Sequence, residues 1–507
     1  MSKTESKNDW DRFAVRMREL HDLAHIGGVL GWDQQTMMPP KGAAARGRAM
    51  GTLAGVRHER VVDPELGSLI ASLEGSDLDA EKKAMVKRMR RGFDLETKLP
   101  ARLVQERAET ASAAHVTWEE ARRKDDFEIF APHLEKTFEL LAEQAEYLGY
   151  DKEPYDAHLD LFEMGMKTSD VEPVFDEVAK QVRPLLSRVL ETSTQDWELP
   201  ATPDHLDALL SYSRDLVSRI GFDMQGGRLD LTAHPFCSGT DPGDVRLTTR
   251  LDANNPKECV LATVHEAGHG MYQQGIPTEW MGTAIGSYIS LAVHESQSRL
   301  WENHVARSRA FWQGEAPRAS AAIAPWKGLG ADDFYKGTNR VRPDSYIRVE
   351  ADELTYPLHV ILRFEIEIAV SRGDLKARDL PGVWNESMHK HLGITPPNDA
   401  KGVLQDVHWS SGLFGYFPTY LLGSIYSAGL FNKATVDLGG QSKVDSAFVA
   451  GDFSALLGWL RDKIHSKGAL YDPMELINLA LDRPANSPID TTAYTDYLRD
   501  KFTALYG

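Results

Sequence analysis

The chain has 507 residues, of which 42% are hydrophobic and 26% are charged. These proportions are typical of globular proteins and exclude a disordered or collagen-like chain. The net charge is −18, from 75 acidic and 57 basic residues. Sequence-independent nucleic-acid binding needs a basic face that neutralises phosphates, so we expect a folded protein that binds no nucleic acid.

The cysteine content and the N-terminal sequence indicate which cellular compartment the protein occupies. The two cysteines, Cys237 and Cys259, would form a weak disulfide framework for so long a chain, and a reduced chain is the simpler interpretation. The polar N-terminus, MSKTESKNDWDRF, lacks the apolar core of a secretory signal. The sequence contains no run of 18 or more apolar residues, so no membrane span is predicted. We therefore expect a cytoplasmic protein without membrane contact.

Hydrophobic periodicity predicts a mainly α fold. Over the first 220 residues apolar side chains recur every three or four positions, as in successive amphipathic helices. Apolar and polar residues then alternate around the turn sequence SGTDPGD, which predicts a short antiparallel β element. Helical patterns resume at Pro256 and continue to the end. We expect one domain over 1–507, with helices at about 1–225, a small sheet at about 227–252, and further helices at about 255–507.

An HExxH motif, HEAGH, occupies residues 265–269. Its surroundings predict a helix of about 18 residues. Asn255 suits the N-cap, Pro256 suits the first turn, and Glu258 has the spacing of a capping box. Gly275 and Pro277 provide the stop.

The motif has the residue types and spacing of a zinc peptidase site. His265 and His269 are four residues apart, so they share one helix face and present two imidazoles to one metal ion. Glu266 is rotated by about 100° from His265, beside the water that the metal would activate. This is the position of a general base. The alternative, a chance HExxH on a surface helix, is disfavoured by the helix signals around the motif.

Catalytic zinc usually has three protein ligands and one open position, so a third ligand must come from elsewhere. Residues 287–308 form another amphipathic helical pattern, which contains His294 and Glu295. Glu295 suits a site of two histidines and one glutamate. His294 is the rival, and Glu302 is a weaker one that could be an ordinary solvated charge. Adjacent residues point apart on a helix, so only one of His294 and Glu295 can bind, and spacing alone leaves the choice open.

Further segments resemble the carboxypeptidase Taq family of metallocarboxypeptidases, also called thermostable carboxypeptidases. Besides HEAGH, the resemblance is carried by HPF at 234–236, DVRLT at 244–248, HESQ at 294–297, IRVEAD at 347–352 and GVLQDVHW at 402–409. The segments GWDQQTMMPPKGAAAR at 31–46 and GYFPTYLLG at 415–423 also look like family sequence.

The resemblance implies a helical, saddle-shaped, zincin-like fold with a deep substrate groove, and commonly a homodimer. It implies removal of single residues from the C-termini of peptides, with broad side-chain tolerance. The implied metal is zinc, one ion per chain, with cobalt as a possible substitute. It also implies that Glu295 is the third ligand beside His265 and His269.

A carboxypeptidase needs a cation that pairs with the terminal carboxylate of its substrate, and the planar arginine side chain does this best. The motifs offer Arg348 and Arg246. Either arginine could instead form a structural ion pair, and Asp352, four residues after Arg348, is a possible partner. His234 could contact substrate or satisfy backbone groups near the sheet.

The oxyanion of a tetrahedral intermediate needs hydrogen-bond donors beyond the metal, and His408 and Tyr420 are the candidates. A buried histidine or tyrosine is more often a satisfied core group. Gln405 and Asp406 could orient neighbouring side chains.

Two other functions remain open at the level of sequence. The same metal site would serve an oligopeptidase or an aminopeptidase. A non-catalytic, metal-stabilised binding protein is the second alternative, and Glu266 argues against it, because a structural zinc site needs only ligands and is usually closed by four.

Overall fold

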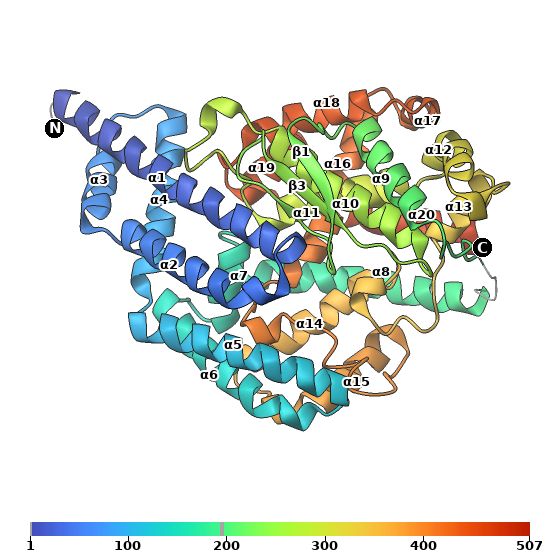
Figure 1. Cartoon of the computed structure of the whole chain (residues 1–507), viewed down its shortest axis with the longest axis horizontal. Coiled ribbons are helices and arrows are strands. Elements are labelled where there is room, and N and C mark those ends of the chain that lie inside the picture. Colours follow the sequence, from blue (N-terminus) through green and yellow to red (C-terminus); the bar gives the residue numbers. More distant parts are fainter. Residues whose placement is uncertain (1–2, 193–196) are drawn as a thin grey trace.

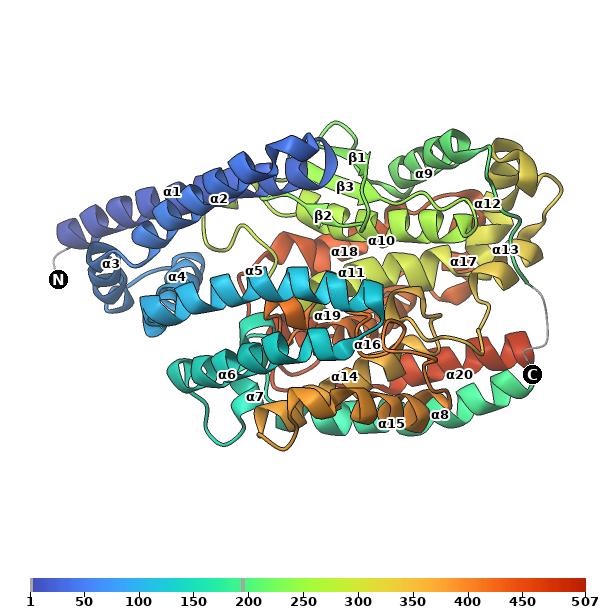
Figure 2. The ribbon, with the colours of Figure 1, turned by 60° about the horizontal axis from the view of Figure 1, so that its bottom comes forward.

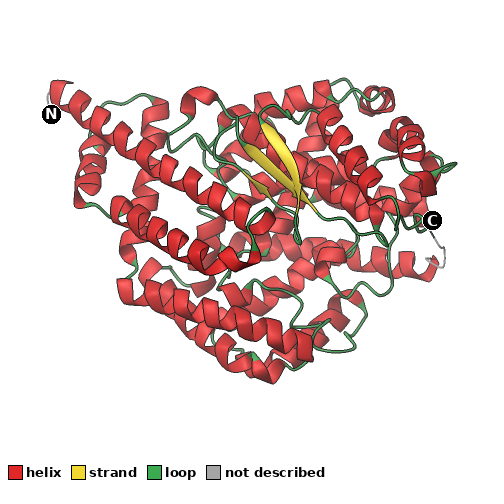
Figure 3. Cartoon of the chain, viewed as in Figure 1, coloured by secondary structure: helices red, strands yellow, loops and turns green. Residues whose placement is uncertain are grey.

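The computed structural model describes residues 3–192 and 197–507. Helices predominate within these ranges, and one small sheet lies among them (Figure 3). The two ends of the chain lie at opposite ends of the long axis (Figure 1). In the described ranges no helix is both long and apolar enough to cross a bilayer. The mainly α fold class is confirmed.

The chain before the sheet is helical, as predicted for residues 1–225. In α8, Val171, Val174, Val178 and Val182 are buried at intervals of three and four residues, which is the amphipathic spacing. The helices of this part are α1 (Lys3–Thr36), α2 (Ala43–Val61), α3 (Pro64–Glu74), α4 (Ala80–Lys98), α5 (Ala101–Lys124), α6 (Ala131–Leu148), α7 (Pro154–Phe162), α8 (Thr168–Thr192) and α9 (Leu206–Ile220).

The helices α1, α3 and α4 share a small core of their own beside the main body, and α2 packs against α1 (Figure 1). Phe13, Leu66, Ile70 and Met85 are buried in that core, and Trp280 of the main body packs into it. A much larger core joins α5 through α20. The helix α1 is long enough to leave the small core and reach the sheet (Figure 2). The assignment of one domain to the whole chain stays a prediction.

The sheet consists of β1 (Gly227–Leu231), β2 (Cys237–Ser238) and β3 (Val245–Thr249), in the order β1-β3-β2. The prediction of an antiparallel element is correct for β2 and β3 but wrong for β1 and β3, which pair in parallel. The chain leaves β1, forms β2 at the far edge and returns through the turn sequence into the central strand. That route makes β3 antiparallel to β2 and parallel to β1.

After the sheet the chain is helical again, and α10 begins at Pro256 as predicted. Asn255 lies at the N-cap, as predicted, but its side chain makes no capping hydrogen bond. Packing against β3 and α9 holds this buried helix instead. The helices are α10 (Pro256–Gln274), α11 (Leu291–Arg299), a π-helical turn (Leu300–Ala306), α12 (Arg309–Ala322), α13 (Ala331–Thr338), α14 (Tyr356–Ser371), α15 (Leu380–Leu392), α16 (Pro418–Asp437), α17 (Gln441–Ala450), α18 (Ser454–Lys463), α19 (Pro473–Ala480) and α20 (Thr492–Tyr506).

Close packing of α10 against α11 depends on Gly268, the fourth residue of the HExxH motif. A Cβ atom on Gly268 would lie 2.6 Å from the Cα of Ser298 and 2.7 Å from the carbonyl oxygen of Gln297. Both are backbone atoms, which cannot rotate away. The two helices therefore approach as closely as they do only because this position carries no side chain.

We expect Gly268→Ala to force α10 and α11 apart, at a cost of about 1–3 kcal/mol in the free energy of unfolding. Denaturant titration measures this loss. The matched control is Gly458→Ala in α18, where no atom lies within 4 Å of the added Cβ. That variant should be more stable by about 0.5–1 kcal/mol, because alanine is the better helix former. Similar stability changes in the two variants would contradict the close-packing argument.

Candidate metal centre

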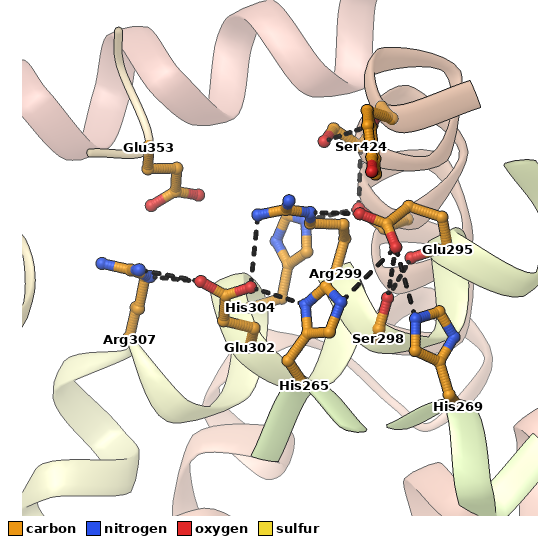
Figure 4. A network of polar contacts seen from close by, with 12 residues as sticks. His265, His269, Glu295, Ser298, Arg299, Glu302, His304, Arg307, Glu353 and Ser424 are labelled. Atoms are coloured by element: carbon orange, nitrogen blue, oxygen red, sulfur yellow. Dashed lines mark hydrogen bonds and ion pairs between the residues drawn. The ribbon is translucent and has the colours of Figure 1, made fainter. Parts of the chain in front are cut away.

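The structure brings together the three predicted ligands, two from α10 and one from α11 (Figure 4). The Nε2 atoms of His265 and His269 lie 3.5 Å and 3.4 Å from Oε2 of Glu295. All three candidate ligand atoms lie within 4.8 Å of one another. Two imidazole nitrogens and one carboxylate oxygen facing a common point form a typical donor set for a catalytic divalent metal.

The other nitrogen of each imidazole is engaged, and this fixes the orientation of both rings. Nδ1 of His265 donates to Oε2 of Glu302 at 2.9 Å, and Nδ1 of His269 donates to the carbonyl oxygen of His294 at 3.0 Å. Such contacts to a carboxylate or carbonyl are typical of metal-binding histidines. The imidazole of His294 stacks on His269, with ring centroids 4.1 Å apart. His294, the rival ligand, therefore lies beside the site and supports it through its backbone.

A closed ring of polar contacts connects two of the ligands from behind (Figure 4). Nε of Arg299 donates to Oε1 of Glu295 at 2.7 Å, and Nη1 of Arg299 donates to Oε2 of Glu302 at 3.2 Å. Glu302 in turn accepts from His265, and the ion pair of His265 Nε2 with Oε2 of Glu295 at 3.5 Å closes the ring. Because Arg299 occupies Oε1 of Glu295, only Oε2 of this carboxylate faces the two imidazoles.

Glu302 is not the solvated charge considered from sequence, since it is only 7% exposed. It lies in the π-helical turn that follows α11, and its Oε1 also accepts from Arg307 at 2.8 Å. Burial alone would raise the pKa of this carboxyl, but Arg299 and Arg307 outweigh it and hold the pKa well below its usual range. Glu302 is therefore an ionised partner of His265.

The electrostatics of the cluster fit a bound cation. Burial by itself lowers the pKa of His265, but Glu295 and Glu302 outweigh it and raise the pKa to about 10. A positive charge is thus favoured where the ligand atoms converge. The residues present fit a divalent metal both in donor type and in charge.

Glu266 is 6% exposed, and no hydrogen bond ties its carboxylate to any described residue. Burial raises the pKa of this carboxyl above its usual value. Both oxygens are therefore available for proton transfer next to His265.

A second buried cluster surrounds Arg348. Its Nε and Nη2 atoms lie 3.0 Å and 2.9 Å from Oδ1 of Asp406, and Nε of Arg363 lies 2.7 Å from Oδ2 of the same carboxylate. The suggested pairing of Arg348 with Asp352 is wrong, because the side chain of Asp352 accepts backbone N–H groups in its own turn. The oxygen of Gln405 accepts from the backbone of Arg348 and from Arg363, so Gln405 and Asp406 orient their neighbours as suggested.

His408 and Tyr420 lie in this second cluster. Nε2 of His408 is hydrogen-bonded to the hydroxyl of Tyr420 at 3.3 Å. Burial and the nearby Arg348 lower the pKa of His408 to about 3, so its imidazole is neutral. The ring of Tyr420 lies beneath Arg348, with the guanidinium carbon 4.9 Å from the ring centroid.

The helix α16 connects the two clusters. Tyr420 lies one turn before Gly423, and a Cβ on Gly423 would be 2.6 Å from Cγ of Glu295. The bare backbone at Gly423 lets α16 lie directly against Glu295. Tyr420 is thereby held within one helical turn of the residue that contacts Glu295.

The two remaining candidates differ. Arg246 in β3 pairs with both oxygens of Asp244, at 2.7 Å and 2.8 Å, and its guanidinium carbon lies 4.4 Å from the ring centroid of Trp32. His234 is exposed on the loop between β1 and β2, and within the described ranges no contact joins it to either cluster.

The sequence interpretation missed Arg299, Arg363 and Tyr356. Tyr356 packs under Arg299, whose guanidinium carbon is 4.1 Å from the ring centroid. A local signal existed for Arg299 alone: it lies four residues after Glu295 and three before Glu302, which is the spacing of helical ion pairs.

Comparison with known proteins decides the class. Residues 12–502 match the family model described as carboxypeptidase Taq (M32) metallopeptidase. The chain belongs to this family. It is 40% identical over 505 residues to thermostable carboxypeptidase 1 of Thermus thermophilus, with 97% of each chain covered. It is 36% identical to thermostable carboxypeptidase 1 of Pyrococcus furiosus, with coverage of 96% of this chain and 97% of that one.

The fold agrees with this membership. The crystal structure of an M32 carboxypeptidase from Deinococcus radiodurans R1 superposes with a TM-score of 0.94 at 36% identity, covering 99% of this chain and 100% of that one. The chain is thus a metal-dependent carboxypeptidase, a peptidase of the hydrolase class. The oligopeptidase, aminopeptidase and non-catalytic alternatives are not favoured.

We expect Glu302→Gln to weaken metal binding by about 10–100-fold, because the partner that orients His265 loses its charge. Competition with a chromophoric chelator measures the dissociation constant directly, without any assay of hydrolysis. The matched control is Glu315→Gln, which neutralises another buried carboxylate that pairs with Arg219 on α9. This control should lower stability but leave metal affinity unchanged. An unaltered dissociation constant in Glu302→Gln would contradict the role of the ring.

Proposed function

We propose that this metallocarboxypeptidase uses zinc held by His265, His269 and Glu295, and that Glu266 is its general base. Cobalt is a possible substitute for zinc. One observation carries the proposal. Nε2 of His265, Nε2 of His269 and Oε2 of Glu295 converge on a point beside the buried carboxylate of Glu266, which no hydrogen bond joins to any other described residue. Substrates are peptides with a free C-terminus, from which single residues are removed with broad side-chain tolerance.

The mechanism needs one activated water and one proton carrier. When bound at this site, a divalent cation acts as a Lewis acid toward the carbonyl oxygen and lowers the pKa of water. A carboxylate oxygen of Glu266 takes a proton from the attacking water as the water oxygen bonds to the last peptide carbonyl carbon. Glu266 then gives that proton to the amine nitrogen as the C–N bond breaks, which releases the terminal residue.

The second cluster suits recognition of the chain end. Asp406 engages Nε and Nη2 of Arg348, so Nη1 stays available to a substrate carboxylate. We assign this contact to Arg348, with Arg246 as the second cation. Tyr420 and the neutral His408 are proposed donors to the oxyanion that forms on the attacked carbonyl. His234, exposed beside the sheet, is proposed to contact the substrate further from the reacting bond.

The assembly and the compartment are also proposals. We propose that the protein is a homodimer, on the basis of the family resemblance alone. We also propose that it is cytoplasmic. Cys237 and Cys259 are both free thiols, which supports a reducing compartment. The deep groove and the absence of nucleic-acid partners stay predictions.

Glu266→Gln should bind the metal normally, and its kcat should be lower by a factor of about 10²–10⁴, because the amide cannot carry the proton. Metal content and mass-spectrometric release of C-terminal residues from one unmodified peptide are measured together. Glu258→Gln, the same change two turns earlier in α10, is the control and should stay active. A Glu266→Gln enzyme with undiminished hydrolysis would refute the role of the base.

Arg348→Lys keeps the charge but loses the planar pair of donors. We expect KM for peptides with a free C-terminus to rise by about 10–100-fold, the range for a hydrogen bond to a charged group. The wild type should process C-terminally amidated peptides poorly, and the variant should narrow that difference. Arg372→Lys, which alters an exposed arginine paired with Glu153, is the control. If Arg348→Lys retains the full preference for free carboxylates, another residue recognises the chain end.

A further inference from the structure

Trp32, in the segment GWDQQTMMPP at the end of α1, is buried without belonging to a hydrophobic core. It is 7% exposed, yet it is absent from each core cluster of the described residues. Its indole lies instead against two arginines. The guanidinium carbons of Arg246 and Arg228 are 4.4 Å and 4.6 Å from the ring centroid. The side chain therefore serves as a surface for cations.

The two arginines are presented together by the sheet. Arg228 of β1 and Arg246 of β3 are register partners in the parallel pair, which places their side chains next to each other on one face. Asp230 holds Nε and Nη2 of Arg228 at 2.6 Å and 2.7 Å, and Asp244 holds the same atoms of Arg246 at 2.7 Å and 2.8 Å. In each arginine one edge is bound by a carboxylate and a face lies against the indole, and no hydrogen bond to another described residue engages Nη1.

Separate contacts fix α1 to both loops of the sheet, the one between β2 and β3 and the one between β1 and β2. Nε2 of His21 donates to the carbonyl oxygen of Thr240 at 2.9 Å, and Nδ1 of His25 is hydrogen-bonded to the hydroxyl of Thr240 at 2.6 Å. The hydroxyl of Thr232 donates to the carbonyl oxygen of Gln35 at 3.3 Å. These bonds lie on both sides of Trp32 along the helix, so the indole is held firmly over the strands.

We propose that Trp32 is a positioning residue for recognition of the substrate's terminal carboxylate, acting through Arg246. The indole attracts the guanidinium, displaces water from one of its faces and fixes its plane. Together with Asp244 it restricts Arg246 to one orientation, so less conformational entropy is lost when a carboxylate binds. The inference rests on the proposed role of Arg246 and makes the first helix a part of substrate recognition.

The test compares Trp32→Phe, which keeps an aromatic face, with Trp32→Leu, which keeps apolar bulk alone. Each variant is assayed on one peptide with a free C-terminus and on the same peptide amidated. We expect Trp32→Leu to raise KM for the peptide with a free C-terminus by about 3–10-fold, with kcat nearly unchanged. The acid-to-amide preference, which is the ratio of kcat/KM for the free peptide to kcat/KM for the amidated one, should fall by the same factor. Trp32→Phe should stay within about twofold of the wild type. Trp32→Met replaces the leucine variant if that variant does not fold.

The control is Trp10→Leu, which removes another indole from α1 that lies under a cation, Lys82, in the separate N-terminal core. It should leave the acid-to-amide preference unchanged. Equal KM values in the phenylalanine and leucine variants would overturn the role of the aromatic face. If Trp32→Leu keeps the wild-type preference for a free over an amidated C-terminus, the whole inference is overturned.

Arg246→Ala separates this inference from the proposed function. If that variant keeps the full acid-to-amide preference, Arg246 does not recognise the carboxylate, and both proposals on it fall. If Arg246→Ala loses the preference while Trp32→Leu keeps it, the role of Arg246 stands and only that of Trp32 fails.

Discussion

The geometry of the metal site depends on one buried ring of charges, in which Arg299 joins Glu295 to Glu302 and Glu302 joins back to His265. Isolated buried charges cost several kcal/mol each, so neither carboxylate would readily stay ionised without its cationic neighbours. In the ring each carboxylate faces a guanidinium or an imidazole. This mutual compensation keeps one oxygen of Glu295 and one nitrogen of His265 turned toward a shared point.

The ring also explains the unusual helix geometry around the site. A π-helical turn follows α11 directly, and such turns occur frequently at functional sites. The π-helical turn places Glu302 next to Nδ1 of His265. Glu295, two helical turns earlier, faces Nε2 of the same imidazole. Gly268 and Gly423 supply the space that this arrangement needs on two sides of α11. The absence of two side chains is thus as necessary as the presence of the ligands.

The sequence predicted what depends on local spacing. The helical segments, the start of α10, the shared face of His265 and His269, and the candidate Glu295 follow from periodicity, motif spacing and family resemblance. What failed depends on partners distant in the chain. Arg348 pairs with Asp406, 58 residues away, rather than with Asp352 in its own turn. The direction of β1 relative to β3 follows from the route of the loop, and Asn255 occupies the predicted N-cap without a side-chain capping bond.

Recognition of a chain end imposes a problem that the metal site does not solve, because a terminal carboxylate needs unpaired N–H groups in a chain with net charge −18. An arginine in so acidic a protein is readily paired by a carboxylate of the protein itself. Asp244 and Asp406 each engage the Nε side of their arginine and leave Nη1 free, so the pairing orients the cation without exhausting its donors. Aromatic faces then fix the planes: Tyr420 lies beneath Arg348, and Trp32 lies against Arg246. The same arrangement, with a carboxylate on one edge and an aromatic ring on one face, is thus found at both arginines that are proposed for carboxylate recognition.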